Sequence, residues 1–121
     1  MNEMKIIETS SIKKWYAIID NFIAKGYIHV TTLLGVRKLC TGGPDSVIDV
    51  KGEIVLVKVD YNDGPERNVN IAVLAKPGSE VTVRSIVEYC GPNGYAKNKL
   101  IRYTVMENGK IAKEVLEEKF I

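Results

Sequence analysis

The sequence predicts an α+β fold, in which one N-terminal helix packs on a curved antiparallel meander sheet of about five to six strands. Three observations predict it. Apolar residues recur at every second position in successive runs between Gly52 and Tyr89, a period typical of strands. The connections between these runs are too short for crossover helices, so neighbouring runs should pair antiparallel. An amphipathic stretch over residues 11–25 precedes the runs and supplies the helix.

Length and composition indicate one soluble domain. The chain has 121 residues, so we expect a single domain over residues 1–121. It is 45% hydrophobic and 26% charged, and its net charge of +2 is too small to indicate a polyanionic partner. No apolar run approaches the ~20 residues that span a membrane. The segment Met1–Glu8 lacks the apolar centre of a signal peptide. We therefore expect a cytoplasmic protein with no membrane partner.

The helix predicted over residues 11–25 has recognisable ends. Ser10 and Ser11 offer hydroxyl groups that can accept hydrogen bonds from free amides of the first turn. Gly26 can adopt the left-handed conformation that closes a helix. Between these ends, bulky apolar residues recur at spacings of three and four. This apolar stripe should lie on the sheet, and it consists of Trp15, Tyr16, Ile19, Phe22 and Ile23.

Residues 27–40 allow two interpretations. Tyr27–Leu34 is rich in β-branched residues and favours a strand, which Val36–Cys40 could continue past a bend at Gly35. The alternative is a helix-turn-helix centred on Gly35. Its second helix would meet the glycine-rich segment Thr41–Pro44 after about one turn, too short to lie along a major groove. The strand is therefore the favoured interpretation.

The remaining elements are predicted as strands. A short apolar run at Lys5–Ile7 could be an edge strand, and Ser46–Val50 leads back into the sheet. The odd-numbered positions of the alternating runs should form the core together with the helix stripe. The carboxylates of Asp60 and Asp63 favour a solvated hairpin tip over a cation site. The alternating runs cover residues 52–61, 69–75, 81–89 and 99–106.

The C-terminal segment begins with a hairpin signal. Asn108–Gly109 suits a type I′ turn, because that turn requires positive φ at two positions. A strand should follow the turn. The segment 111–121 is also rich in Lys and Glu and fits a helix by propensity, so it could become helical toward its end.

The sequence predicts no catalytic residue, no metal site and no cofactor. It contains no P-loop, no dinucleotide-binding glycine motif and no paired-cysteine zinc motif. The single histidine, His29, lies in the middle of a predicted strand. Cys40 and Cys90 leave three alternatives open: two buried small hydrophobes, a disulfide between them, or a reactive thiol. Whether the chain is an enzyme stays open, and we lean toward a non-enzyme.

A basic and aromatic segment is the strongest candidate for a binding surface. Every charged residue between Tyr89 and Met106 is basic, and tyrosines lie among the cations. Cations with aromatic rings suit phosphates and stacked bases. The alternative is that Tyr103 faces the core and the lysines are only a soluble surface. The candidate nucleic-acid-binding residues are Tyr95, Lys97, Lys99 and Arg102, extended by Lys13, Lys14, Arg37 and Lys38.

Three functions therefore remain open. The first is a non-enzymatic binding module that contacts nucleic acid or another protein through the basic and aromatic segment. The second is a structural or accessory protein that forms homo-oligomers through an exposed sheet edge. The third is a small-molecule-binding protein or an enzyme with a pocket between helix and sheet.

Overall fold

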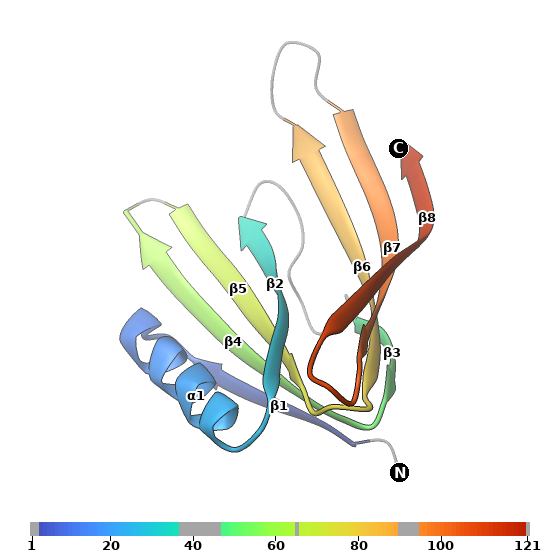
Figure 1. The fold of residues 1–121 in the computed structure, drawn as a ribbon. Helices are drawn as coiled ribbons and strands as arrows, with labels where there is room; N and C mark the ends of the chain where they lie inside the picture. The colour runs from blue at the N-terminus through green and yellow to red at the C-terminus, as the bar shows by residue number, and fades with distance from the viewer. Residues whose placement is uncertain (1–2, 37–46, 65, 90–94, 121) are drawn as a thin grey trace.

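A computed structural model describes the backbone of residues 3–36, 47–64, 66–89 and 95–120, which form one helix and eight strands (Figure 1). The strands build two four-stranded sheets. Sheet A has the order β1-β4-β5-β2, with β1 at Glu3–Thr9, β4 at Glu53–Asp63, β5 at Glu66–Ala75 and β2 at Ile28–Val36. Sheet B has the order β3-β6-β7-β8, with β3 at Val47–Lys51, β6 at Glu80–Tyr89, β7 at Tyr95–Val105 and β8 at Ile111–Phe120.

The predicted α+β class is confirmed, but the strands form two sheets instead of one sheet of five to six strands. The reason lies in the central strands of sheet A. Ile54–Val57 and Ile71–Ala75 are buried at every position, so both faces of sheet A need a covering layer. Helix α1, at Ile12–Ala24, covers one face and sheet B covers the other. The alternating pattern assigned only the odd-numbered residues of these runs to the core, so the prediction missed the even-numbered core residues.

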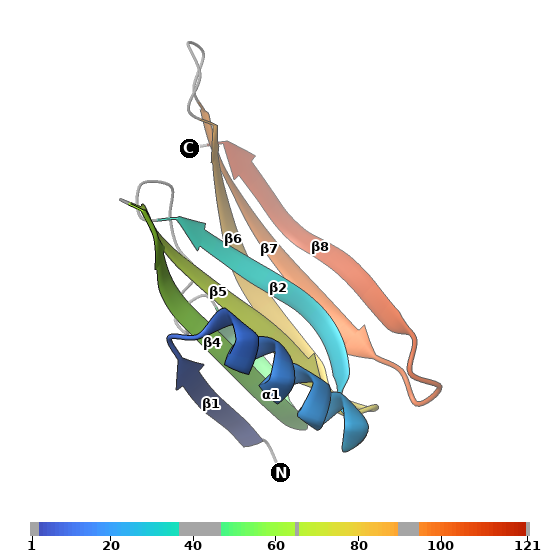
Figure 2. The ribbon, with the colours of Figure 1, turned by 90° about the vertical axis from the view of Figure 1, so that its left-hand side faces the viewer.

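Helix α1 lies across the outer face of sheet A (Figure 2). Its bounds agree with the prediction: Ser11 is the N-cap, and its hydroxyl accepts a 3.3 Å hydrogen bond from the amide of Lys14. Gly26 has the left-handed φ of +97° that ends the helix. Among the stripe residues, Trp15 and Ile19 are buried against β4 and β5, and Phe22 packs at the edge of this cluster. Tyr16 and Ile23 are exposed.

The main core lies between the two sheets. Its sheet A side includes Leu56 and Val73, and its sheet B side includes Val83 and Tyr103. The odd-numbered positions of residues 69–75, 81–83 and 101–105 face this core, as predicted. Those of β4 face the helix instead. The two sheets diverge toward the C-terminal ends of β4 and β6, so they do not close into a barrel (Figure 1).

The turn Lys76–Ser79 carries the chain from sheet A to sheet B, where the sequence predicted a continuing meander. The amide of Ser79 donates a 3.0 Å hydrogen bond to the carbonyl oxygen of Lys76, and Gly78 has φ +86°. A proline followed by a glycine of positive φ is typical of a type II turn. Ser79 then pairs with Val105 of the second sheet. The neighbours β4–β5, β6–β7 and β7–β8 do pair antiparallel, as predicted.

Two open alternatives are decided. Residues 28–36 form strand β2, so the helix-turn-helix interpretation is wrong for them. Residues 111–120 form strand β8 throughout, so the helical alternative is wrong there. The hairpin at Asn108–Gly109 is confirmed, but its loop has a different geometry. The amide of Gly109 bonds to the carbonyl of Met106 and the amide of Met106 bonds to the carbonyl of Lys110, which makes a three-residue loop. Lys5–Ile7 lies within β1, an edge strand that pairs parallel with β4.

Candidate functional site

Arg102 is held by two carboxylates. Its Nη2 lies 2.8 Å from Oε2 of Glu114 on β8, and its Nε lies 3.7 Å from Oε1 of Glu80 on β6. The hydrogen bond and charge of Glu114, followed by the charge of Glu80, raise the pKa of Arg102 above its ordinary value. A guanidinium that already binds two carboxylates has less charge to offer a phosphate. Arg102 therefore joins β6, β7 and β8 on the outside of sheet B.

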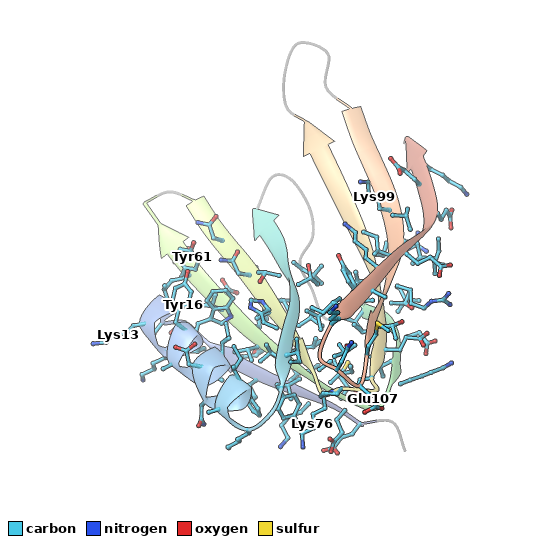
Figure 3. The ribbon with its side chains drawn as sticks, in the orientation of Figure 1. Lys13, Tyr16, Tyr61, Lys76, Lys99 and Glu107 are labelled. Atoms are coloured by element: carbon cyan, nitrogen blue, oxygen red, sulfur yellow. The ribbon has the colours of Figure 1, made fainter. Side chains whose placement is uncertain are left out.

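The other described residues of β7 divide between core and surface. Tyr103 is buried in the main core, which confirms the alternative that it faces inward. Lys99 is half-buried near the end of the molecule where the sheets diverge (Figure 3). Tyr95 and Lys97 lie on β7, but the structure describes only their backbone.

The described part of the predicted basic extension, Lys13 and Lys14, does not lie beside β7. Lys13 and Lys14 are exposed on α1, which lies on the face of sheet A opposite sheet B. Figure 3 shows Lys13 and Lys99 on opposite sides of the molecule. Arg37, Lys38, Cys40 and Cys90 lie outside the described residues, so the disulfide alternative stays a prediction. His29 is exposed on β2, where its Nε2 lies 2.8 Å from the hydroxyl oxygen of Thr32.

The interface between helix and sheet is filled by side chains. Trp15 and Ile19 pack against Val55, Val57 and Val59, and the indole Nε1 of Trp15 donates a 2.7 Å hydrogen bond to the carbonyl of Val57. The third function requires a pocket at this place. In the part of the chain that the structure describes, this interface is a packed core, and the depression described next lies elsewhere.

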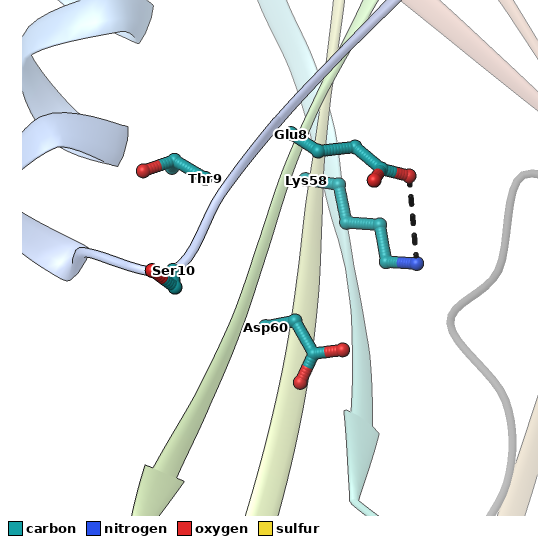
Figure 4. Close-up of a pocket in the computed structure, with 5 residues that line it drawn as sticks. All are labelled: Glu8, Thr9, Ser10, Lys58 and Asp60. Carbon is teal, nitrogen blue, oxygen red and sulfur yellow. Dashed lines mark ion pairs between the residues drawn. The ribbon is translucent and has the colours of Figure 1, made fainter.

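A polar depression of about 320 Å³ opens on sheet A, where the C-terminal end of β1 meets β4 (Figure 4). Its lining is Glu8, Thr9, Ser10, Lys58 and Asp60. Nζ of Lys58 lies 3.7 Å from Oε1 of Glu8, so the two charges offset one another. Thr9 points away from this pair, and its hydroxyl accepts a hydrogen bond from the amide of Ser11. Within the described residues, no group of three or more His, Cys, Asp or Glu side chains is placed to hold a metal ion.

Strand β8 presents an uncovered apolar surface. Burial falls abruptly between β7 and β8, although their side chains are register partners on the same face. Val105 is 0% exposed and its partner Ile111 is 39% exposed; Ile101 is 6% exposed and its partner Val115 is 46% exposed. The core between the sheets therefore ends at β7, and β8 extends beyond the cover of sheet A (Figure 2).

The backbone of β8 is open on one side as well. β8 is ten residues long and stands at the end of the strand order of sheet B, so no described strand pairs with its outer edge. Sequence reasoning left this segment undecided between strand and helix and did not identify it as a site. The signal available in the sequence was the Asn108–Gly109 turn, which requires a returning strand.

Comparison with protein-family models, with characterised proteins and with solved structures finds no match to this chain. The described part of the chain contains no helix that is long and apolar enough to span a bilayer.

Proposed function

We propose that this protein is a non-enzymatic binding module that binds a polypeptide in extended conformation along the free edge of β8. The observation that carries the proposal is the drop in burial from Val105 and Ile101 on β7 to Ile111 and Val115 on β8. An additional strand would bond to the open edge of β8 and would bury these apolar side chains. This mode of recognition draws its affinity from main-chain hydrogen bonds and its specificity from alternate side chains.

The edge of β8 is long enough for this role. Its ten residues span about 33 Å at ~3.3 Å per residue, which is enough for another strand to pair along the whole of β8. The opposite edge of sheet B, β3, has five residues and an irregular register with β6. Exposed apolar side chains on β8 also include Leu116, which is 41% exposed. An accessible edge with exposed apolar side chains is a template for another strand.

Nucleic acid is the less supported partner. Arg102 is engaged by Glu80 and Glu114, and Lys13 and Lys14 lie two layers away from β7. Lys99, the other candidate cation on β7 whose side chain is described, lies opposite the carboxylate-bearing residue Glu118 of β8 in the ladder.

Selection of short random peptides displayed on phage tests the proposal. The immobilised bait is the wild-type protein, and Val115→Lys is the edge variant. Ile23→Lys is its matched control, because Ile23 is also apolar and is 45% exposed, but lies on α1. We expect selected peptides to bind the wild type and Ile23→Lys equally, and Val115→Lys at least tenfold more weakly. Peptides that bind all three proteins equally would overturn the proposal, and so would failure to select any peptide if the protein is monomeric in solution. Thermal unfolding of each variant verifies that it folds.

A further inference from the structure

We infer that the strand which β8 accepts is β8 of a second copy of this chain, paired antiparallel so that Lys113 of each copy lies opposite Glu118 of the other. The inference rests on the proposed function and names its partner. It depends on where the bulge in β8 places the charged side chains.

Lys113 and Glu118 lie on the same face of sheet B. Register partners in an antiparallel ladder share a face, and Lys113 pairs with Tyr103, which faces the main core. Glu118 pairs with Lys99, which lies two positions before Ile101 and shares its face. Both charged residues therefore belong to the face of β8 that turns toward sheet A.

The bulge makes this possible. Positions 113 and 118 differ by an odd number, so a regular strand would place them on opposite faces. The register with β7 shifts between Leu100 and Ile101: Ile101 pairs with Val115, whereas Leu100 pairs with Glu117. The extra residue, Leu116, reverses the alternation.

Only a strand with such a shift can pair with its own copy in this register, because residues directly opposite one another must share a face. A two-fold axis relates the copies, so the Lys113–Glu118 contact occurs twice in the dimer. The same register places Val115 opposite Leu116 and Ala112 opposite Lys119. The ladder extends over the whole of β8, from Ile111 to Phe120. The two copies of sheet B would form one continuous eight-stranded sheet.

Charge complementarity selects this partner. A lysine on an edge strand opposes indiscriminate pairing, because an apolar or basic strand cannot satisfy its ammonium group. β8 itself supplies the carboxylate that Lys113 requires. Glu118 already has an interaction within its own chain, and a carboxylate can accept from more than one donor.

On the opposite face of sheet B, the register places Glu114 opposite Glu117. Like charges in this position are unfavourable. Each of them is offset within its own chain, since Glu114 binds Arg102 at 2.8 Å and Glu117 binds Lys119 at 2.7 Å. The register is therefore compatible with the charges on both faces of β8.

Sedimentation equilibrium of five proteins tests the inference: the wild type, Lys113→Glu, Glu118→Lys, the double reversal, and Lys110→Glu as the control. Lys110 closes the hairpin loop before β8 and lies outside the ladder. We expect the wild type and Lys110→Glu to dimerise equally. Each single reversal changes two attractive pairs into two repulsive ones, so the dimer dissociation constant should rise by about tenfold. The double reversal should return it to within about threefold of the wild type.

The outcomes separate the inference from the proposed function. A monomeric wild type that still binds selected peptides through β8 would overturn the inference and leave the proposed function standing. A monomer that binds no peptide would overturn both. A dimer that is insensitive to Lys113→Glu, or a double reversal that does not recover dimerisation, would show that the copies associate by another surface or register and would overturn the inference.

Discussion

The indole nitrogen of Trp15 and the carbonyl oxygen of Val57 form a buried 2.7 Å hydrogen bond, 42 positions apart in the sequence. It joins α1 to the second strand in the order of sheet A, inside the cluster that the helix covers. A tryptophan that is both packed and hydrogen-bonded specifies the position and the rotation of its helix more closely than an aliphatic side chain would.

Replacement of Trp15 should therefore separate packing from hydrogen bonding. We expect Trp15→Ala to lower the free energy of unfolding by ~3–5 kcal/mol. Trp15→Phe retains much of the apolar ring but leaves the carbonyl of Val57 without this donor, at a cost of about 1–3 kcal/mol. Phe22→Ala should cost less than Trp15→Ala, because Phe22 is half-buried. Urea unfolding measures all three, with the exposed Lys13→Ala as the control. An unchanged midpoint for Trp15→Ala would contradict the docking of α1 described above.

Gly52 and Gly26 are matched substitution sites that test the close approach of Gly52 to Ser79. Both have positive φ, +86° and +97°. A Cβ on Gly26 would meet nothing within 4 Å, whereas one on Gly52 would lie 2.5 Å from Oγ of Ser79. Gly26→Ala should cost roughly 1–2 kcal/mol for the left-handed backbone alone. Gly52→Ala should cost about 1–3 kcal/mol more, because Ser79 is buried and must move.

A double-mutant cycle isolates that contact. The hydroxyl of Ser79 accepts a 3.1 Å hydrogen bond from the amide of Glu53, so Ser79→Ala alone should destabilise the protein. In the Gly52→Ala background the same change also removes the clashing oxygen. We therefore expect Ser79→Ala to cost less in that background than in the wild type. Additive free energies of unfolding would show that the strain at Gly52 does not arise from the hydroxyl oxygen of Ser79.

The pKa of Glu117 provides a test of the β8 surface in solution. Its carboxylate accepts a hydrogen bond from Lys119, and this bond and the lysine's charge, with a smaller contribution from the charge of Arg84, lower the pKa of Glu117. A lowered pKa favours the ionised form of the folded state. The resulting stabilisation is present above the pKa of the unfolded chain, and it is lost as the pH falls through the folded pKa.

Carboxyl titration by NMR measures this shift. We expect Lys119→Ala to raise the pKa of Glu117 toward its ordinary value, and Arg84→Ala to raise it less. Equal titration of Glu117 in the wild type and in Lys119→Ala would contradict the ion pair.

The proposed function also makes a prediction for nucleic acid. We expect no binding of single-stranded oligonucleotides at tens of micromolar protein in low salt, and no effect of Arg102→Ala, because Arg102 already binds Glu80 and Glu114. Fluorescence anisotropy at two salt concentrations checks this. Three phosphate contacts from Lys97, Lys99 and Arg102 would instead give a log–log slope of about −2. Such a slope, flattened by Arg102→Ala, would contradict the prediction and support the basic segment as the binding surface.

Local patterns were sufficient for the elements whose signals are short-range. The ends of α1 follow from the hydroxyl of Ser11 and the conformational freedom of Gly26, both of which act within one helical turn. The hairpins follow from turn residues such as Asn108 and Gly109. The alternation of Val81 and Val83 predicted their place in the core, since the period of a strand is a property of the backbone.

The candidate site could not be predicted in this way. The basic residues around Arg102 are conspicuous in the sequence, but the carboxylates that engage it come from two other strands. Burial at Val115 depends on whether sheet A reaches over β8, and no local pattern carries that information. The bulge that brings Lys113 and Glu118 to one face arises from the pairing of β8 with β7.

The sequence by itself determined the α+β class, the helix and most of the strands, because propensity, capping and turn chemistry act between neighbouring residues. Tertiary structure alone decided that the strands divide into two sheets. Ile54–Val57 is apolar on both faces, and such a run is stable only when a layer covers each face. Only the packed molecule shows that helix α1 and sheet B supply those two layers. The same packing leaves β8 beyond the end of the core, where its apolar side chains remain exposed.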